Sequence, residues 1–119
     1  MVSVTNSTLD HNVAQGGRGG YGVGGGIADV LSATTTVAGS TLTQNEAIGG
    51  EGGGAGLGGG ASNDATSTLE LTDSSVTRNQ ANGSPGIGGG VYNLGTFTFD
   101  ALTVIAGNEA STSDDEIGP

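Results

Sequence analysis

A run of three glycines followed by an apolar or small residue occurs three times in this chain, and it constrains the fold more than any other feature. The copies are Gly24-Gly25-Gly26-Ile27, Gly58-Gly59-Gly60-Ala61 and Gly88-Gly89-Gly90-Val91. Each copy leads at nearly the same distance to an Asn-x-Ala ending, so segments 24–47, 58–81 and 88–110 are equivalent units of 24, 24 and 23 residues. Such a repeat indicates supersecondary units stacked in one dimension, each burying its apolar face against its neighbours.

Gly-rich segments of variable length join the units. They comprise residues 15–23, 48–57 and 82–87, and each ends on an apolar residue directly before a glycine triplet. Residues 2–14 match the second half of a unit, and residues 111–119 form a polar tail in which we recognise no cap for the last unit. We therefore expect one domain over residues 1–119, in which constant coils carry Gly-rich loop inserts.

Within the units, apolar residues recur with the period of two that is typical of β-strands. The equivalent segments are Val2-Ser3-Val4, Thr35-Thr36-Val37, Leu69-Glu70-Leu71 and Phe97-Thr98-Phe99. A second strand is expected around Leu9, Leu42, Val76 and Val104, and a third around Ile27, Ala61 and Val91. This pattern predicts an all-β fold, a parallel β-helix or β-solenoid, with about three and a half coils of 23–24 residues.

The repeats also predict which side chains stack on one another. We expect interior stacks of Val4, Val37, Leu71 and Phe99, and of Leu9, Leu42, Val76 and Val104. We expect a turn to carry Asn12, Asn45, Asn79 and Asn108. At a spacing of about 4.8 Å, these asparagines would form an amide ladder. Contact between them and a ligand is the alternative interpretation.

The segments Leu42-Thr43-Gln44-Asn45 and Val76-Thr77-Arg78-Asn79, together with the glycine triplets, resemble the repeats of right-handed parallel β-helix surface proteins of bacteria. These include autotransporter passengers and polymorphic outer-membrane proteins, with Gly-Gly-Ala-Ile and Phe-x-x-Asn signatures. The resemblance covers residues 2–110 and is closest at 88–99, although Leu or Val replaces the Phe and Val104 lies four residues before Asn108 instead of three. It implies a right-handed coil at the cell surface, but no particular activity.

Composition restricts the partners. Twelve acidic residues against two arginines, Arg18 and Arg78, give a formal charge of −10, which disfavours nucleic acid and anionic membrane surfaces. No segment has the roughly 20 apolar residues that a membrane-spanning helix needs. The dispersed acids are typical of a solubilising surface, with weak divalent-cation binding as the alternative. Since there is no cysteine, disulfides and thiolate chemistry are excluded.

Few side chains are suited to catalysis, so we expect neither an enzyme nor a cofactor or metal site. His11 is the single histidine and aligns with Gln44 and Arg78 on an outward turn. The alignment of the first two inserts places Arg18 beside Glu51, and we expect these two side chains to form an ion pair that aligns the loops.

The expected function is structural. A short solenoid leaves strand edges unpaired at both ends, and head-to-tail stacking of copies would cover them and build an extracellular filament or stalk. One alternative is a surface adhesin that binds a glycan or host protein through the Gly-rich loops and Tyr21 or Tyr92. A second is a polysaccharide lyase, and ice binding through threonine rows is a weaker hypothesis.

Overall fold

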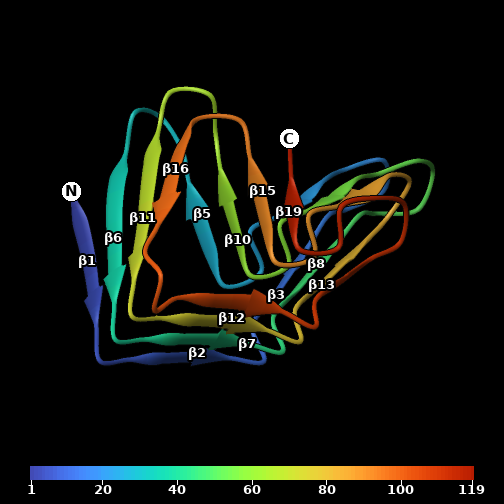
Figure 1. Ribbon diagram of the computed structural model, residues 1–119. Coiled ribbons are helices and arrows are strands. Elements are labelled where there is room, and N and C mark those ends of the chain that lie inside the picture. Colours follow the sequence, from blue (N-terminus) through green and yellow to red (C-terminus); the bar gives the residue numbers. More distant parts are fainter.

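The protein is a parallel β-solenoid, described for all residues 1–119 by a computed structural model (Figure 1). The chain winds through five small sheets, and every strand pair is parallel. Three complete turns separate the first and last strands of the first sheet. The all-β class and the stacked parallel architecture expected from the repeats are therefore confirmed. There is no helix that could span a membrane.

The strands of each sheet come from successive turns. The first sheet contains β1 (Val2–Thr5), β6 (Thr34–Ala38), β11 (Thr68–Thr72) and β16 (Thr96–Phe99). The second contains β2 (Thr8–Asp10), β7 (Thr41–Thr43), β12 (Ser75–Thr77) and β17 (Val104–Ala106). The third contains β3 (Val13–Gln15), β8 (Glu46–Ile48), β13 (Gln80–Asn82) and β18 (Glu109–Ala110).

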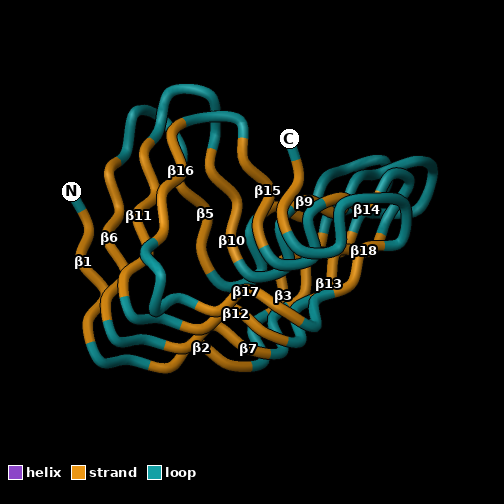
Figure 2. The backbone as a smooth tube through the Cα atoms, viewed as in Figure 1, coloured by secondary structure: helices purple, strands orange, loops and turns teal.

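Two further sheets complete each turn. The fourth contains β4 (Gly22–Val23), β9 (Gly56–Leu57) and β14 (Gly86–Ile87). The fifth contains β5 (Ile27–Asp29), β10 (Ala61–Asn63), β15 (Val91–Asn93) and β19 (Ile117–Gly118). Figure 2 shows these strands recurring at the same places around the coil, with the Gly-rich loops extended on one side.

The number of strands per turn differs from the expectation of three. The two additional strands lie at the Asn-x-Ala endings and inside the Gly-rich inserts, so an insert belongs to the coil wall. One turn, measured between ladder asparagines, is 33, 34 and then 29 residues long. Two-residue strands carry no periodicity of their own, and they form because the neighbouring turn supplies their hydrogen bonds.

The first interior stack follows the expected register. Val4 pairs with Val37, Val37 with Leu71, and Leu71 with Phe99. Phe99 occupies this register on the last turn, where no further turn covers it, and its ring lies 5.5 Å from the ring of Phe97. Phe99 is therefore not part of the buried core, and the residues of the outer turns that pack against that core are Val4, Leu9, Ile27, Phe97 and Ile105.

The second stack contains Leu9, Leu42 and Val76, but its last member is Ile105 and the prediction of Val104 was wrong. Val104 pairs with Ser75 and is 53% exposed, while Ile105 packs against the core. Successive side chains of a strand point to opposite faces, so a shift of one residue turns Val104 outward. Ile105 precedes Asn108 by three residues, as Leu42 precedes Asn45.

Close approach between turns explains the glycine triplets. A Cβ on Gly60 would lie 2.6 Å from the Gly90 carbonyl oxygen and 2.8 Å from Val76 Cγ1. The first glycine of each triplet has a positive φ, for example +72° at Gly58. Both conditions favour glycine over any residue with a Cβ.

The tail belongs to the solenoid, contrary to the expectation of an uncapped end. The amides of Gly88 to Val91 donate to the carbonyl oxygens of Ser113 to Glu116, and β19 then pairs with β15. The polar sequence of residues 111–119 gave no strand signal, because main-chain bonds to β15 hold this segment whatever its side chains are.

Candidate functional site

The four predicted asparagines are joined by side-chain hydrogen bonds. Nδ2 of Asn12, Asn45 and Asn79 donates to Oδ1 of the asparagine on the next turn, at 2.9, 3.0 and 2.9 Å. The backbone amide of each donor residue binds the same Oδ1. Each inner asparagine also donates to a main-chain carbonyl of the preceding turn, as Asn79 does to Leu42 at 3.0 Å.

These contacts leave the inner asparagines no group for a ligand. Asn45 and Asn79 are both 0% exposed, and every polar atom of their carboxamides is hydrogen bonded. Buried amides satisfied in this way rigidify a turn. The asparagine row therefore acts as a structural ladder that aligns one coil on the next.

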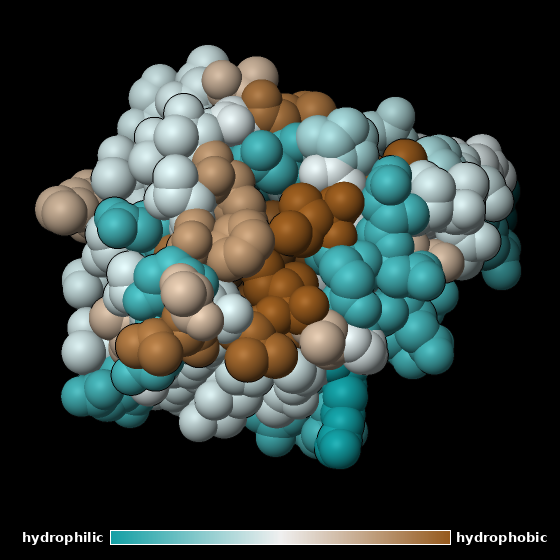
Figure 3. Space-filling model, in the orientation of Figure 1, coloured by the Kyte–Doolittle hydropathy of each residue, from teal (hydrophilic) through white to brown (hydrophobic).

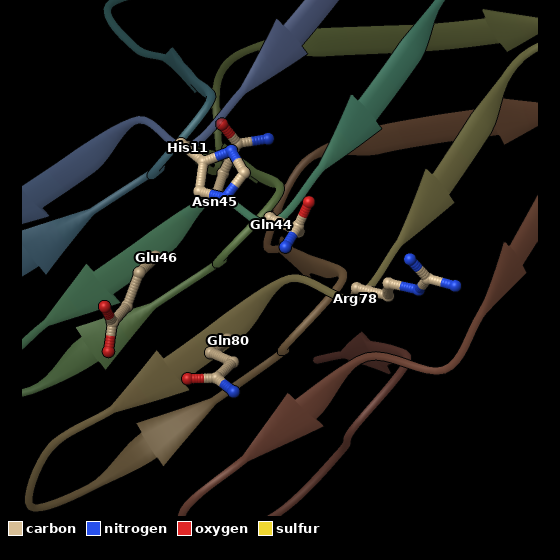
Figure 4. Close-up of a pocket in the computed structure, with 6 residues that line it drawn as sticks. All are labelled: His11, Gln44, Asn45, Glu46, Arg78 and Gln80. Atoms are coloured by element: carbon tan, nitrogen blue, oxygen red, sulfur yellow. The ribbon is translucent and has the colours of Figure 1, made fainter.

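The residue before each of the first three ladder asparagines projects from the solenoid. His11, Gln44 and Arg78 have φ values of +55°, +54° and +58°. This left-handed conformation at a sharp turn directs their side chains outward (Figure 4). Since the three residues belong to successive turns, they form a row along the solenoid surface.

This row borders a polar groove of about 300 Å³, lined by His11, Gln44, Asn45, Glu46, Arg78 and Gln80. Glu46 and Gln80 lie in register on neighbouring strands, away from the Arg78 side chain in Figure 4. His11 Nδ1 lies 2.6 Å from Asp10 Oδ1, and Glu46 Oε1 accepts from Asn82 Nδ2 at 2.6 Å. The polar groove thus offers guanidinium and amide donors beside one carboxylate, with no apolar lining. Such chemistry suits a hydroxylated ligand.

A second groove of about 470 Å³ lies on the loop side, lined by Gln15, Gly16, Arg18, Ile48, Gly49, Gly50 and Glu51. The first two inserts run together here, because the Gly19 amide donates to the Glu51 carbonyl at 2.6 Å and Gly50 donates to Gly20 at 2.9 Å. Arg18 and Glu51 form no ion pair, so that prediction was wrong. The loops are aligned through their backbones, which glycine allows to approach closely.

The remaining candidates do not converge. Tyr21 is exposed on the first insert, whereas Tyr92 is half-buried on β15, in the fifth sheet. No three His, Asp or Glu side chains come together in a way that could hold a metal ion.

The structure also contains a ladder of hydroxyl groups that was not predicted from the sequence. The backbone amide of Ser7 donates to Ser40 Oγ at 3.0 Å, Ser40 to Ser74 Oγ at 3.2 Å, and Ser74 to Thr103 Oγ1 at 3.3 Å. A signal for it exists in the sequence, because each of these residues lies five positions before a ladder asparagine. Counting back three positions from each ladder asparagine would likewise have identified Ile105 as a core residue.

A third polar row is incomplete. Asp29, Asn63 and Asn93 lie in register, and Asn63 Nδ2 donates to Asn93 Oδ1 at 2.8 Å. Asp29 Oδ1 accepts from the Thr35 hydroxyl at 2.6 Å. Asp29 Oδ2 and Asn63 Oδ1 are buried without a hydrogen-bond partner. A carboxylate has no proton to donate to the next carboxamide, so the ladder is interrupted at this position.

Two aspartates hold turns with their carboxylates. The Leu31 amide donates to Asp64 Oδ2 at 2.8 Å, and this bond, with those from Ser67 and the Thr66 amide, holds the pKa of Asp64 well below its usual range. The Thr103 hydroxyl and then the Asp73 amide lower the pKa of Asp100. Hydrogen bonds to the ionised form are the cause in both cases.

Comparison with protein-family models, curated proteins and solved structures finds no match to this chain. Within the structure, the candidate binding surfaces are the polar groove, the loop groove and the two end faces of the solenoid.

Proposed function

We propose that this protein is a structural β-solenoid that self-associates head to tail through its end coils, forming a filament or surface stalk outside the cell. One observation carries the proposal. Leu71 is 0% exposed, whereas Phe99 occupies the equivalent position on the next turn and is 51% exposed. An uncovered apolar position on an unpaired strand edge is the type of surface that another strand covers.

The opposite face has the same character. Val2 on edge strand β1 is 52% exposed, while Leu69, two turns along the same row, is 0% exposed. Figure 3 shows the face at the other end, formed by the last turns, where apolar side chains gather near the centre with hydrophilic residues beside them. Both ends therefore expose positions that are core in the middle.

A second copy of the chain fits these faces better than an unrelated partner. The first and last turns share one outline, since β1 and β16 belong to the same sheet. The two longer dimensions of the molecule, 38 and 28 Å, bound a face comparable with the roughly 800 Å² per partner of a standard interface. Contact between two different faces does not close on itself, so repetition yields an open filament.

The proposed location rests on composition and on the resemblance to bacterial surface β-helices of the autotransporter and polymorphic outer-membrane types. The chain has no cysteine and 26 glycines, and its stability derives from repeated backbone hydrogen bonding. A net charge of −10 would keep such a protein soluble until end faces meet.

Sedimentation velocity over a wide concentration range, with negative-stain electron microscopy of the same samples, tests self-association. We expect concentration-dependent growth and unbranched filaments at the upper end. Val2→Asp and Phe99→Asp should each suppress growth, because each places a charge on one end face. Tyr21→Asp is the matched control, with the same charge on the loop side. Monomers of 11.3 kDa at every concentration, or equal suppression by Tyr21→Asp, would refute the proposal.

The polar groove favours a second candidate, adhesion to a glycan. Its donors Gln44 and Arg78 lie on successive turns, about 4.8 Å apart along the solenoid, a spacing suited to repeated hydroxyl groups. A glycan array probed with the purified protein tests this candidate. Saturable binding should be lost in Arg78→Ala and retained in Arg18→Ala, which removes the same charge from the loop groove. Binding that survives Arg78→Ala excludes the polar groove.

A further inference from the structure

The tail contains a fourth copy of the triplet position, occupied by Asp114-Asp115-Glu116 in place of three glycines. The Gly89 amide donates to the Asp114 carbonyl and the Gly90 amide to the Asp115 carbonyl, as Gly59 and Gly60 donate to Gly88 and Gly89 one turn earlier. Asp114 also has a φ of +60°, close to the +68° of Gly88. The backbone of residues 114–116 therefore repeats the geometry of a glycine triplet, but its three side chains are acidic.

The third triplet position lies against the ladder asparagine of the following turn. A Cβ on Gly26 would be 3.1 Å from Asn45 Nδ2, on Gly60 3.1 Å from Asn79 Nδ2, and on Gly90 2.8 Å from Asn108 Nδ2. Glycine at this position thus makes room for the next carboxamide. Glu116 carries a Cβ and a full side chain where the asparagine of a fifth turn would have to lie.

Glu116 also occupies the hydrogen bonds of that absent asparagine. Asn108 Nδ2 donates to Glu116 Oε2 at 2.6 Å, just as Asn79 Nδ2 donates to Asn108 Oδ1 at 2.9 Å. The Gly107 amide donates to Glu116 Oε1 at 2.9 Å. One carboxylate therefore accepts from the ladder amide and from a backbone amide beside it, and Glu116 ends the ladder.

Asp115 supports the same end of the solenoid. The Ala110 amide on edge strand β18 donates to Asp115 Oδ1 at 3.0 Å. This carboxylate takes a strand-edge donor that a further strand would otherwise use. The Asp114 carboxylate, in contrast, accepts only from the neighbouring Ser113 hydroxyl, at 3.0 Å.

We propose that Asp115 and Glu116 form a terminal cap that opposes the addition of a fifth coil, so that a second copy can bind this face only when the Glu116 side chain leaves Asn108. This inference rests on the proposed head-to-tail association and adds a step that regulates it. In the assembled state, Asn12 of the second copy takes the place of Glu116 as the acceptor for Asn108. Asn12 Oδ1 accepts no hydrogen bond in the single chain and has the capacity to do so.

The test compares Glu116→Gly with Asp114→Gly. Both variants remove one negative charge from the same tripeptide and introduce glycine at a position whose counterparts on earlier turns are glycine, so both should fold. Glu116→Gly alone frees Asn108 and makes room for an added asparagine. We expect its self-association in sedimentation to begin at a concentration at least tenfold lower than that of the wild type, and Asp114→Gly to change this concentration less than threefold.

Amide exchange of the monomers provides a local measurement. The backbone amides of Gly107 and Asn108 both donate to the Glu116 carboxylate, at 2.9 and 3.4 Å. Glu116→Gly should lower the protection of these two amides at least tenfold, and Asp114→Gly should not. Equal association of the wild type and Glu116→Gly would overturn the cap while leaving head-to-tail assembly intact. Unchanged protection in Glu116→Gly would also overturn it. If Glu116→Gly loses amide protection but no variant associates, the proposed function is refuted, and the regulation by Glu116 inferred from it is refuted too.

Discussion

Asp29 lies in register with Asn63 on the adjacent turn, and each has one buried side-chain oxygen without a hydrogen-bond donor. Asn63 Nδ2 donates to Asn93 Oδ1 in the same row. Asp29 is thus the one residue of the row whose side chain has no N–H group to donate to its neighbour. The elements beside Asp29, namely β6, β10 and residues 64–67, contribute one other titratable group, the carboxylate of Asp64. Neither arginine forms an ion pair with Asp29.

This relationship predicts that Asp29→Asn stabilises the protein. The new Nδ2 group can donate to Asn63 Oδ1 and complete the row, and the new Oδ1 can still accept from Thr35. Because an unsatisfied buried polar group costs about 1–3 kcal/mol, we expect the free energy of unfolding to rise by about 1–2 kcal/mol in urea titration. Asp29→Ala, which loses the Thr35 bond, should be less stable than the wild type. A destabilised Asp29→Asn variant would contradict this account.

The asparagine ladder should be most sensitive at its centre. Asn79→Ala removes bonds to Asn108 and Leu42 and leaves the Asn45 amide groups without their acceptor. We expect thermal denaturation to show a loss of about 3 kcal/mol or more, as several buried groups become unsatisfied. Asn12→Ala is the comparison on the exposed first turn and should cost about 1 kcal/mol. Equal losses would mean that burial does not determine the strength of the ladder.

Neighbouring residues of β17 should differ strongly in their contribution to stability. Ile105→Ala removes a side chain that packs against the core, and we expect a loss of about 1–2 kcal/mol in chemical denaturation. Val104→Ala shortens a side chain on the outer face and should change stability by no more than about 0.5 kcal/mol. The reverse order would place Val104 in the core and refute the register described for this strand.

Stability should decrease in acid. The pKa values of Asp64 and Asp100 are lowered in the folded protein relative to an ordinary value of 3.8, so both carboxyls bind protons more readily once unfolded. Their stabilising contribution is complete above about pH 4 and is lost as the pH falls through the lower, folded pKa values. Urea midpoints between pH 6 and pH 2 should show this loss.

An Asp64→Asn variant provides the control for the acid effect. It should be less stable than the wild type at pH 6, because an amide nitrogen, which accepts no hydrogen bond, replaces one of the two oxygens that accept from Leu31 and from Thr66. Its urea midpoint should fall less steeply in acid, since one titrating group is absent. Two results together would argue against Asp64 as a source of the acid sensitivity. The wild-type urea midpoint would stay constant between pH 6 and pH 3, and the midpoints of both proteins would fall equally below pH 3.

The interior of this fold could be predicted well from the sequence because identical positions stack. Val37 lies on Leu71 and Asn45 bonds Asn79, so residues that align in the repeats are the residues that touch. Alternation within Leu69-Glu70-Leu71 determined which side chains face inward. In a parallel, in-register solenoid, sequence alignment and spatial contact are the same relationship.

The tertiary structure decided the features that no repeat encodes. The strand Gly56–Leu57 carries no local pattern and exists because β4 and β14 pair with it. Arg18 and Glu51 align in the repeats, yet their loops meet through backbone groups. Glu116 has no sequence likeness to Gly90, and only the missing turn beside it gives a carboxylate room to bind Asn108. The sequence alone determined the repeating contacts, whereas the folded chain decided the contacts at loops and ends, where the neighbour that defines each position differs from turn to turn.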